Sequence, residues 1–249
     1  YNEVGTGRGW RRLSVRAQNG RKPMRVAVLG TGVVGKTIAD RLAGLGHQVI
    51  VGTRDPEATL MVEETDRMGN PPMKRWLEEH PAIQLRTLPD AAAGAEMIVN
   101  ATNGAGSVEA LRSAGARNLA GKVLMDIANP LDFSRGMPPS LSVVNTDSLA
   151  EQIQREFPTA LVVKTLNTTN ASVMVQPETV HGGDQTMFLC GDDPGAKATV
   201  RTILESFGWT DIIDLGDITA ARGSEMILPI WLRLMGALNT AAFNFKVVR

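Results

Sequence analysis

Residues 24–35 read Met24-Arg-Val-Ala-Val-Leu-Gly30-Thr-Gly32-Val-Val-Gly35, and this stretch decides the fold. The β-branched run before Gly30 predicts a strand. Gly30 then suits a tight turn, Gly32 lets the backbone approach a pyrophosphate, and Gly35 lets the following helix pack closely on the strand. Free N–H groups and the positive dipole end of that helix would hold the anion. The stretch therefore predicts a dinucleotide-binding turn.

The sequence on either side has the order that such a turn requires. Apolar residues recur at helical spacing from Val34 to Leu45, and Gly46 is placed to end that helix. A second β-branched run follows at residues 48–51. A Gly-rich pattern alone is weak evidence, so it is this strand, turn, helix and strand that favours a dinucleotide over a turn without a ligand. We count every residue of the turn as cofactor-binding: Gly30, Thr31, Gly32, Val33, Val34 and Gly35.

Beyond residue 54, β-branched runs continue to alternate with helical stretches, which is typical of a parallel sheet with crossover helices. The further strands are expected at residues 84–87, 97–101, 123–127, 161–166, 186–190 and 211–215. Thr146-Asp147 is placed to cap a helix through Glu156, and Pro194 to open one ending near Phe207. Residues 218–245 resemble one long apolar helical segment.

These patterns predict an α/β fold, a Rossmann-type doubly wound parallel sheet with a small, mainly helical C-terminal part. We expect an NADP-binding Rossmann domain at residues 24–168 and a C-terminal domain for substrate binding or dimerisation at residues 169–249. Residues 1–23 hold six basic residues and one acidic residue. We interpret them as a disordered basic extension before a start at Met24.

Composition excludes several classes of function. The chain of 249 residues has one Cys, expected as a buried strand thiol at Cys190, and three scattered His, so we expect no disulfide and no metal site. Residues 24–249 hold 20 basic and 25 acidic residues, a formal charge of −5, which argues against nucleic-acid binding. No apolar run approaches the roughly 20 residues of a membrane span. We expect a cytoplasmic protein with a small-molecule partner and neither nucleic acid nor membrane.

The end of the second strand distinguishes NADP from NAD. Thr53 and Arg54 stand where an NAD-binding protein has an acid for the ribose 2′-OH. A hydroxyl and a guanidinium suit a 2′-phosphate instead, through charge-assisted hydrogen bonds. Asp55 is the alternative NAD-type acid, but it precedes Pro56-Glu57, as a helix cap does. We therefore expect NADP, with NAD as the alternative.

The nicotinamide should lie across the carboxyl ends of the next strands. Small and amide residues at these two strand ends are the predicted contacts: Ala101, Thr102, Asn103, Ala128, Asn129 and Pro130. The alternative is ordinary turn chemistry, since Asn and Gly dominate turns. The sequence contains no nucleophile elbow, Cys–His pairing or Lys-plus-Asn proton relay that we recognise. We therefore predict no catalytic side chain and a hydride transfer that depends on alignment.

Together these residues resemble the family of F420-dependent NADP oxidoreductases, which are NADPH-dependent reductases of the deazaflavin coenzyme F420. The resemblance covers most of residues 24–249. It is carried by the glycine turn, residues 46–54, the segment Val162-Val-Lys-Thr-Leu-Asn167 and residues 215–231. It implies a Rossmann domain, a small C-terminal domain, a cleft between them and a homodimer. By position it implies that Thr31, Thr53 and Arg54 contact NADP, and that Asn129 and Pro130 face the nicotinamide.

The resemblance also implies coenzyme F420 as the second substrate. Because F420 carries a phosphate and an acidic tail, its groove should present cations. The candidates for substrate binding are Arg135, Lys164, Arg222, Arg233 and, within the resembling segment, Asn167. Two other functions stay open. One is an NADPH-dependent reductase of a flavin, ferric complex, imine or ketone, and the other is a non-catalytic NADP-binding sensor.

Overall fold

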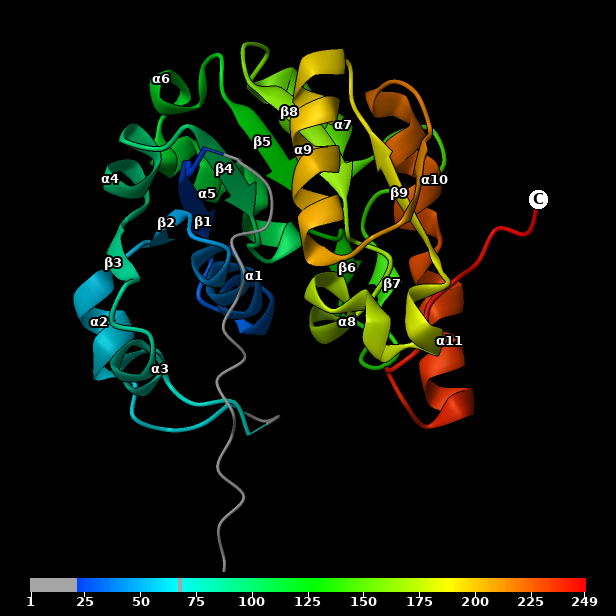
Figure 1. Ribbon diagram of the computed structural model, residues 1–249, viewed down its shortest axis with the longest axis horizontal. Coiled ribbons are helices and arrows are strands. Elements are labelled where there is room, and N and C mark those ends of the chain that lie inside the picture. The colour runs from blue at the N-terminus through cyan, green and yellow to red at the C-terminus, as the bar shows by residue number, and fades with distance from the viewer. Residues whose placement is uncertain (1–21, 67–68) are drawn as a thin grey trace, which may run out of the picture.

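The predicted strand at residues 25–29 is present as β1, within an eight-stranded sheet of order β10-β9-β8-β5-β4-β1-β2-β3 (Figure 1). The computed structural model describes residues 22–66 and 69–249, so residues 1–21 of the expected basic extension lie outside the described residues. The sheet strands are β1 (Arg25–Leu29), β2 (Gln48–Thr53), β3 (Gln84–Thr87), β4 (Met97–Asn100), β5 (Val123–Asp126), β8 (Leu161–Thr165), β9 (Thr186–Cys190) and β10 (Asp211–Asp214).

Six of these strands run parallel, from β3 at one edge to β8, and the last two run the other way. β9 pairs antiparallel with β8 and parallel with β10. The chain between β8 and β9 contains only short helices: α8 (Ala171–Val175), η2 (Pro177–Thr179) and η3 (His181–Gly183). Because β9 starts at the edge where β8 ends, this connection needs no crossover helix. The doubly wound α/β prediction is confirmed, with these two strands reversed.

Helices cover both faces of the sheet (Figure 1). One face carries α1 (Val33–Gly44), α3 (Met73–Glu79), α8 and α9 (Pro194–Phe207). The other face carries α4 (Leu88–Ala93), α5 (Ser107–Ala114), α6 (Ala116–Leu119), α7 (Leu149–Glu156), η4 (Ile218–Ala220) and α10 (Ala221–Met226). The short helices α2 (Pro56–Met61) and η1 (Gly104–Gly106) have no buried residue. Since both faces are covered, β1 is an apolar strand with residues 26–29 all buried.

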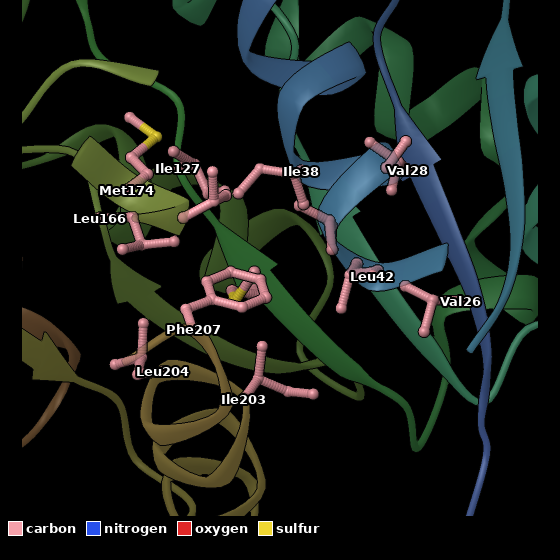
Figure 2. Close-up of a cluster of buried hydrophobic side chains, with 14 of the residues drawn as sticks. Val26, Val28, Ile38, Leu42, Ile127, Leu166, Met174, Ile203, Leu204 and Phe207 are labelled. Carbon is pink, nitrogen blue, oxygen red and sulfur yellow. The ribbon is translucent and has the colours of Figure 1, made fainter. Parts of the chain in front are cut away.

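The apolar core on the first face fixes the position of α1. Ile38 and Leu42 are fully buried and belong to the same cluster as Ile203 and Phe207 of α9. Figure 2 shows these side chains gathered over the sheet, with Val26 nearby. Ile38 and Leu42 lie four residues apart, so they share one face of the helix, as the periodicity predicted. This packing holds the N-terminus of α1 at the end of β1.

Two details of the secondary structure, one helix cap and one strand pair, differ from the sequence-based prediction. Ser148, rather than Thr146-Asp147, caps α7, because its Oγ accepts the N–H of Glu151 at 3.1 Å and also donates to the Glu151 carboxylate. Such reciprocal capping suits a Ser three residues before a Glu. The pair β6 (Leu131–Asp132) and β7 (Ser140–Leu141) was not predicted, because two-residue strands carry no periodicity.

The last third is not one long helix. It forms η4, α10 and α11 (Leu228–Leu238), and residues 239–249 are not helical. Asn239 ends α11 in the left-handed conformation, with φ 52°. None of the described helices has the length and apolar character to cross a bilayer. Strands from both sides of the expected boundary at residue 168 join one sheet, and the two-domain division remains a prediction.

Candidate functional site

The turn between β1 and α1 needs two of its glycines for its own packing and leaves space at the third. A Cβ on Gly30 would lie 2.5 Å from the Ala101 carbonyl oxygen, and one on Gly35 would lie 2.1 Å from the Gly30 carbonyl oxygen. Gly30 also has φ +123°, which favours glycine. No described atom lies within 4 Å of a Cβ built on Gly32. The space over Gly32 fits the close approach of a pyrophosphate.

The N-terminus of α1 is free to bind an anion. Gly32 is its N-cap, so no side chain from the described residues caps the helix, and its first turn has no acidic residue. The first N–H groups of a helix lack partners within the helix, and the helix dipole is positive there. The turn therefore fits the phosphates of a dinucleotide, as predicted. Val33 and Val34 line the cavity beside it, and Thr31 is half-buried.

The predicted 2′-phosphate site lies next to this turn. The Gly30 N–H donates to the Gly52 carbonyl at 3.0 Å, so the residues that end β2 sit beside the glycines. Thr53 is half-buried with its Oγ1 3.0 Å from Thr59 Oγ1, and the Arg54 side chain is exposed. Asp55 caps α2, because its Oδ1 accepts the Ala58 N–H at 3.0 Å. The interpretation of Asp55 as a helix cap is thus confirmed.

A cavity of about 1050 Å³ opens at the carboxyl ends of the strands and extends along the outer face of α1. Five of the predicted cofactor contacts at the strand ends line it: Ala101, Thr102, Asn103, Ala128 and Asn129. Its opposite wall comes from α8 and the residues before it, including Thr169, Asn170, Met174 and Val175. Pro130 is buried behind this lining, and Thr53 and Arg54 are not part of it. The cavity therefore joins the predicted nicotinamide end to a wall that the Rossmann turn does not supply.

The strand ends that line the cavity are held by buried polar side chains. The Thr102 hydroxyl donates to Asn100 Oδ1 at 2.6 Å, and Asn100 Nδ2 donates to Asp126 Oδ1 at 2.7 Å. Asn103 Oδ1 accepts the Ala105 N–H and so caps η1. A Cβ on Gly104 would lie 1.9 Å from the Asn129 carbonyl oxygen. The lack of a side chain at Gly104 therefore allows the residues after β4 and β5 to approach closely.

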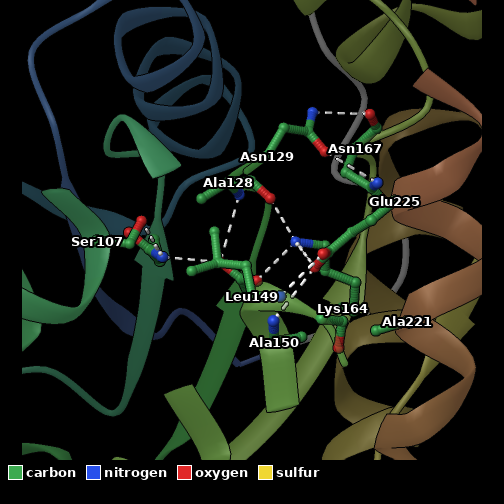
Figure 3. Close-up of polar contacts among 12 residues, drawn as sticks. Ser107, Ala128, Asn129, Leu149, Ala150, Lys164, Asn167, Ala221 and Glu225 are labelled. Atoms are coloured by element: carbon green, nitrogen blue, oxygen red, sulfur yellow. Dashed lines mark hydrogen bonds and ion pairs between the residues drawn. The ribbon is translucent and has the colours of Figure 1, made fainter. Parts of the chain in front are cut away.

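Asn129 and Asn167 form a reciprocal pair. Asn129 Nδ2 donates to the Asn167 carbonyl at 3.0 Å, and Asn167 Nδ2 donates to Asn129 Oδ1 at 3.1 Å and to the Ser224 carbonyl at 3.0 Å (Figure 3). Asn167 is buried and lies behind the lining, whereas Asn129 is part of it. The structure therefore places Asn167 as a support for Asn129 rather than in direct reach of a substrate.

The cations predicted for the acceptor groove are not brought together. Lys164 is fully buried between Asp126 Oδ2 at 2.8 Å and Glu225 Oε1 at 3.0 Å. Arg222 Nε donates to Glu151 Oε2 at 2.9 Å, and this bond lowers the pKa of Glu151. Lys164 and Arg222 are paired with carboxylates inside the protein and do not line the cavity, so they are not available to bind an anionic substrate there. Two others are exposed outside the cavity lining: Arg135 between β6 and β7, and Arg233 on α11.

Two cations that the sequence reasoning missed do line the cavity. Lys36 donates to the Pro71 carbonyl at 2.5 Å. Burial lowers the pKa of its ammonium, and the opposing effect of the Asp66 charge is smaller. Arg41 donates to the Ser206 carbonyl at 3.1 Å, at the end of α9. Both lie on the outer face of α1, where charged residues are common, so the sequence carries no signal for them.

Thr169 is a third missed residue, and here a signal existed. Its side chain is buried, it lines the cavity, and its hydroxyl has no hydrogen-bond partner among the described residues. A buried hydroxyl without a partner is unfavourable, so it is suited to a hydrogen bond with a bound ligand. Thr168-Thr169-Asn170 follows β8, and the rule that placed contacts after β4 and β5 also applies to this strand.

Comparison with known proteins gives the family. Residues 25–130 match the family described as NADP oxidoreductase, coenzyme F420-dependent. The crystal structure of a candidate F420-dependent NADP reductase from Arthrobacter sp. FB24 is 62% identical, covers 91% of this chain and 100% of that chain, and superposes with a TM-score of 0.87. The chain belongs to the family of coenzyme F420-dependent NADP oxidoreductases. The predicted resemblance is confirmed.

More distant relatives agree on the oxidoreductase chemistry and differ in acceptor. The F420-dependent NADP reductase of Methanocaldococcus jannaschii is 26% identical, with 85% of this chain and 92% of that protein aligned. The metalloreductase STEAP3 of Rattus norvegicus is 29% identical over 83% of this chain, which spans only 38% of that longer protein. The family and these relatives together indicate an NADP-dependent oxidoreductase. Within residues 22–66 and 69–249, no group of three or more His, Cys, Asp or Glu could hold a metal ion.

Proposed function

We propose that this F420-dependent NADP oxidoreductase family member transfers a hydride between NADP(H) and coenzyme F420. The observation that carries the proposal is the continuity of the cavity. It runs from Val33 and Val34 at the N-terminus of α1, past the ends of β4 and β5, to the α8 wall. A cavity of about 1050 Å³ lies at the top of the usual range of roughly 300–1000 Å³ for one ligand, and it has room for the nicotinamide end of the cofactor together with an acceptor.

The residues around the cavity supply binding and orientation. The turn at Gly32 and the N-terminus of α1 would hold the pyrophosphate, and Thr53 with Arg54 the 2′-phosphate. Thr102, Ala128 and Asn129 would set the position of the nicotinamide end. When bound, NADPH supplies the hydride. The chain then contributes alignment, which requires reacting carbons about 3–3.5 Å apart.

The acceptor would lie against the wall formed by α8 and the residues before it. Met174 and Val175 give this wall apolar surface, and the unpartnered hydroxyl of Thr169 offers a hydrogen bond to a polar atom of the acceptor. Lys36 and Arg41 are the cations available to an anionic tail along α1. Each would exchange or share its present carbonyl partner on binding.

A second candidate is an NADPH-dependent reductase of another acceptor, such as a flavin, ferric complex, imine or ketone. One observation favours it: both cavity-lining cations already donate to backbone carbonyls, whereas a groove built for an anionic tail would hold them ready. The name of the metalloreductase relative supports including a metal complex among the acceptors to be tried.

The experiment follows NADPH oxidation with each purified acceptor under identical conditions. We expect loss of the absorbance of oxidised F420 in step with NADPH, and turnover with the other acceptors at least about tenfold slower at equal concentration. Turnover with a ferric complex, flavin, imine or ketone, combined with no binding of F420, would replace the first proposal by the second.

We further propose a homodimer that uses α11. Leu228 of this apolar helix is buried, whereas Ile230 and Leu238 are 52% and 53% accessible. Exposed apolar surface of this kind marks an association site.

A further inference from the structure

Three buried charges lie directly behind the nicotinamide side of the cavity. Lys164 on β8, Asp126 at the end of β5 and Glu225 on α10 have side chains that are 0%, 0% and 1% exposed. Burial alone lowers the pKa of Lys164, but the charges of Asp126 and Glu225 outweigh it and raise the pKa above its ordinary value. The cluster is therefore a charged one, with Lys164 at its centre (Figure 3).

Asp126 and Lys164 together hold the peptide groups on both sides of Ala128. Lys164 Nζ donates to the Ala128 carbonyl, and the Ala128 N–H donates to Asp126 Oδ1 at 3.3 Å. Ala128 lines the cavity and is followed by Asn129, which also lines it. The orientation of this wall therefore depends on where the ammonium of Lys164 sits.

Glu225 gives the cluster its third anchor. Its carboxylate accepts the N–H groups of Leu149 and Ala150, at 2.9 and 3.2 Å, at the start of α7. These N–H groups have no partners within the helix, and the carboxylate satisfies them. Its negative charge also interacts favourably with the positive end of the α7 dipole. This bond network joins α7 and α10 to Lys164, whose ammonium links Glu225 to the Ala128 carbonyl.

Stability alone explains the cluster poorly. A buried ion pair contributes little compared with apolar residues of the same shape, because removing charges from water is costly. We infer that Lys164 is a positioning residue for hydride transfer, because it fixes the Ala128–Asn129 wall against which the nicotinamide lies. The inference rests on the proposed NADP-dependent function, and it does not depend on which acceptor is used.

The test measures the nicotinamide end separately from the rest of the cofactor. Bound NADPH is followed by its fluorescence, which reports the environment of the reduced nicotinamide, and its Kd is measured by calorimetry. The variants are Lys164→Met, which removes the ammonium, and Lys164→Arg, which keeps the charge and avoids leaving two buried carboxylates unpaired. The guanidinium of the second variant is too large to occupy the point where one ammonium meets three oxygens.

Two control variants separate positioning from stability. Ile153→Val trims a fully buried side chain of α7 that takes no part in the Lys164 cluster. Ser148→Ala removes the cap of α7 on the same side of the sheet. We expect both controls to lower the melting temperature, bind NADPH with wild-type fluorescence and keep the wild-type rate of hydride transfer.

For the Lys164 variants we expect an NADPH Kd within about threefold of wild type, because the phosphate contacts are intact. We expect loss of the fluorescence change and single-turnover hydride transfer to F420 at least about tenfold slower. Wild-type fluorescence in the folded Lys164 variants would overturn the inference, as would an equal loss in Ile153→Val or Ser148→Ala. If wild-type enzyme fails to reduce F420, the acceptor proposal fails, and the fluorescence and Kd of the same variants still decide the role of Lys164.

Discussion

The backbone N–H of Gly30 donates to the carbonyl of Gly52 at 3.0 Å, which ties the glycine turn to the end of β2. The strands are in matching register, with Leu29 opposite Gly52. Thr53 and Arg54 follow directly, so the residues predicted for the 2′-phosphate stand next to the turn predicted for the pyrophosphate. The predicted distinction between NADP and NAD would therefore rest on the last residue of β2 and on the exposed arginine that follows it.

Arg54→Ala should weaken NADPH binding by about tenfold and leave NADH binding nearly unchanged, since only NADPH offers a 2′-phosphate to the guanidinium. Calorimetric titrations with both nucleotides at one ionic strength measure this difference. Arg86→Ala, an exposed arginine on the neighbouring strand β3, is the matched control and should bind both as wild type does. Equal losses for NADPH and NADH in Arg54→Ala would contradict the assignment.

The two glycines Gly32 and Gly35 should respond differently to alanine. Gly35→Ala places a Cβ 2.1 Å from the Gly30 carbonyl oxygen, so we expect a lower melting temperature together with loss of NADPH binding. Gly32→Ala meets no described atom within 4 Å, so stability should stay close to wild type while NADPH binds about tenfold more weakly. Thermal melts with and without NADPH measure both. Wild-type NADPH affinity in Gly32→Ala would remove Gly32 from the site.

Thr169→Val tests the unpartnered hydroxyl in the cavity wall. We expect the KM for the acceptor to rise several-fold, about 1 kcal/mol for one hydrogen bond, with an unchanged Kd for NADPH. Thr168→Val is a close control, because Thr168 also has a buried hydroxyl without a partner among the described residues but does not line the cavity. It should leave both constants unchanged. A similar rise in KM for Thr168→Val would mean that the effect is transmitted through packing.

Cys190 should make stability fall with pH in alkaline solution. Burial raises the pKa of its thiol to about 12, against roughly 8.5 in the unfolded chain. Below about pH 8.5 the thiol is protonated in both states, and its stabilising contribution to the free energy of unfolding is fully present. Above that pH the unfolded state loses a proton that the folded state keeps. The free energy of unfolding should therefore fall by up to about 1.4 kcal/mol per pH unit relative to Cys190→Ala. Denaturant titrations between about pH 8 and 10 measure both proteins. Parallel pH profiles would show that the thiol ionises in the folded state.

Introducing charge on α11 should separate the proposed dimer. Ile230→Glu with Leu238→Glu is expected to give a monomer in analytical ultracentrifugation, because charge on an apolar interface is desolvated without a partner. Val62→Glu is the control, since Val62 is equally exposed, at 53%, but follows α2 and lies far from α11 in the sequence. A monomeric wild-type protein would end the dimer proposal.

The sequence predicted β1, the glycine turn and α1 well because their signals are local. Apolar spacing from Val34 to Leu45 and the glycines at 30, 32 and 35 each reflect geometry within a few residues. The ends of β4 and β5 also follow from a general rule, since parallel strands place their carboxyl ends at one edge. For the same reason Thr169, after β8, was within reach of sequence reasoning and was missed.

Long-range partners could not be predicted in the same way. The apolar neighbours of Lys164 in Val-Val-Lys-Thr-Leu mark a buried strand, but its partners Asp126 and Glu225 lie far away in the sequence. Lys164 was therefore interpreted as a groove cation. Likewise a β-branched pattern identifies β9 as a strand without giving its direction, because the alternation of side chains is the same both ways.

The reversed direction of β9 has a structural consequence for the residues that precede it. The connection between two parallel neighbouring strands must cross a face of the sheet, usually as a helix that packs on the core. Between Leu166 and Gln185 no helix has to cross the sheet, so Thr169 and Asn170 can line the cavity at the strand ends while α8 packs on the core. Relatives with different acceptors are expected to differ at the positions of this segment that line the cavity, since these can change without disturbing the core beneath.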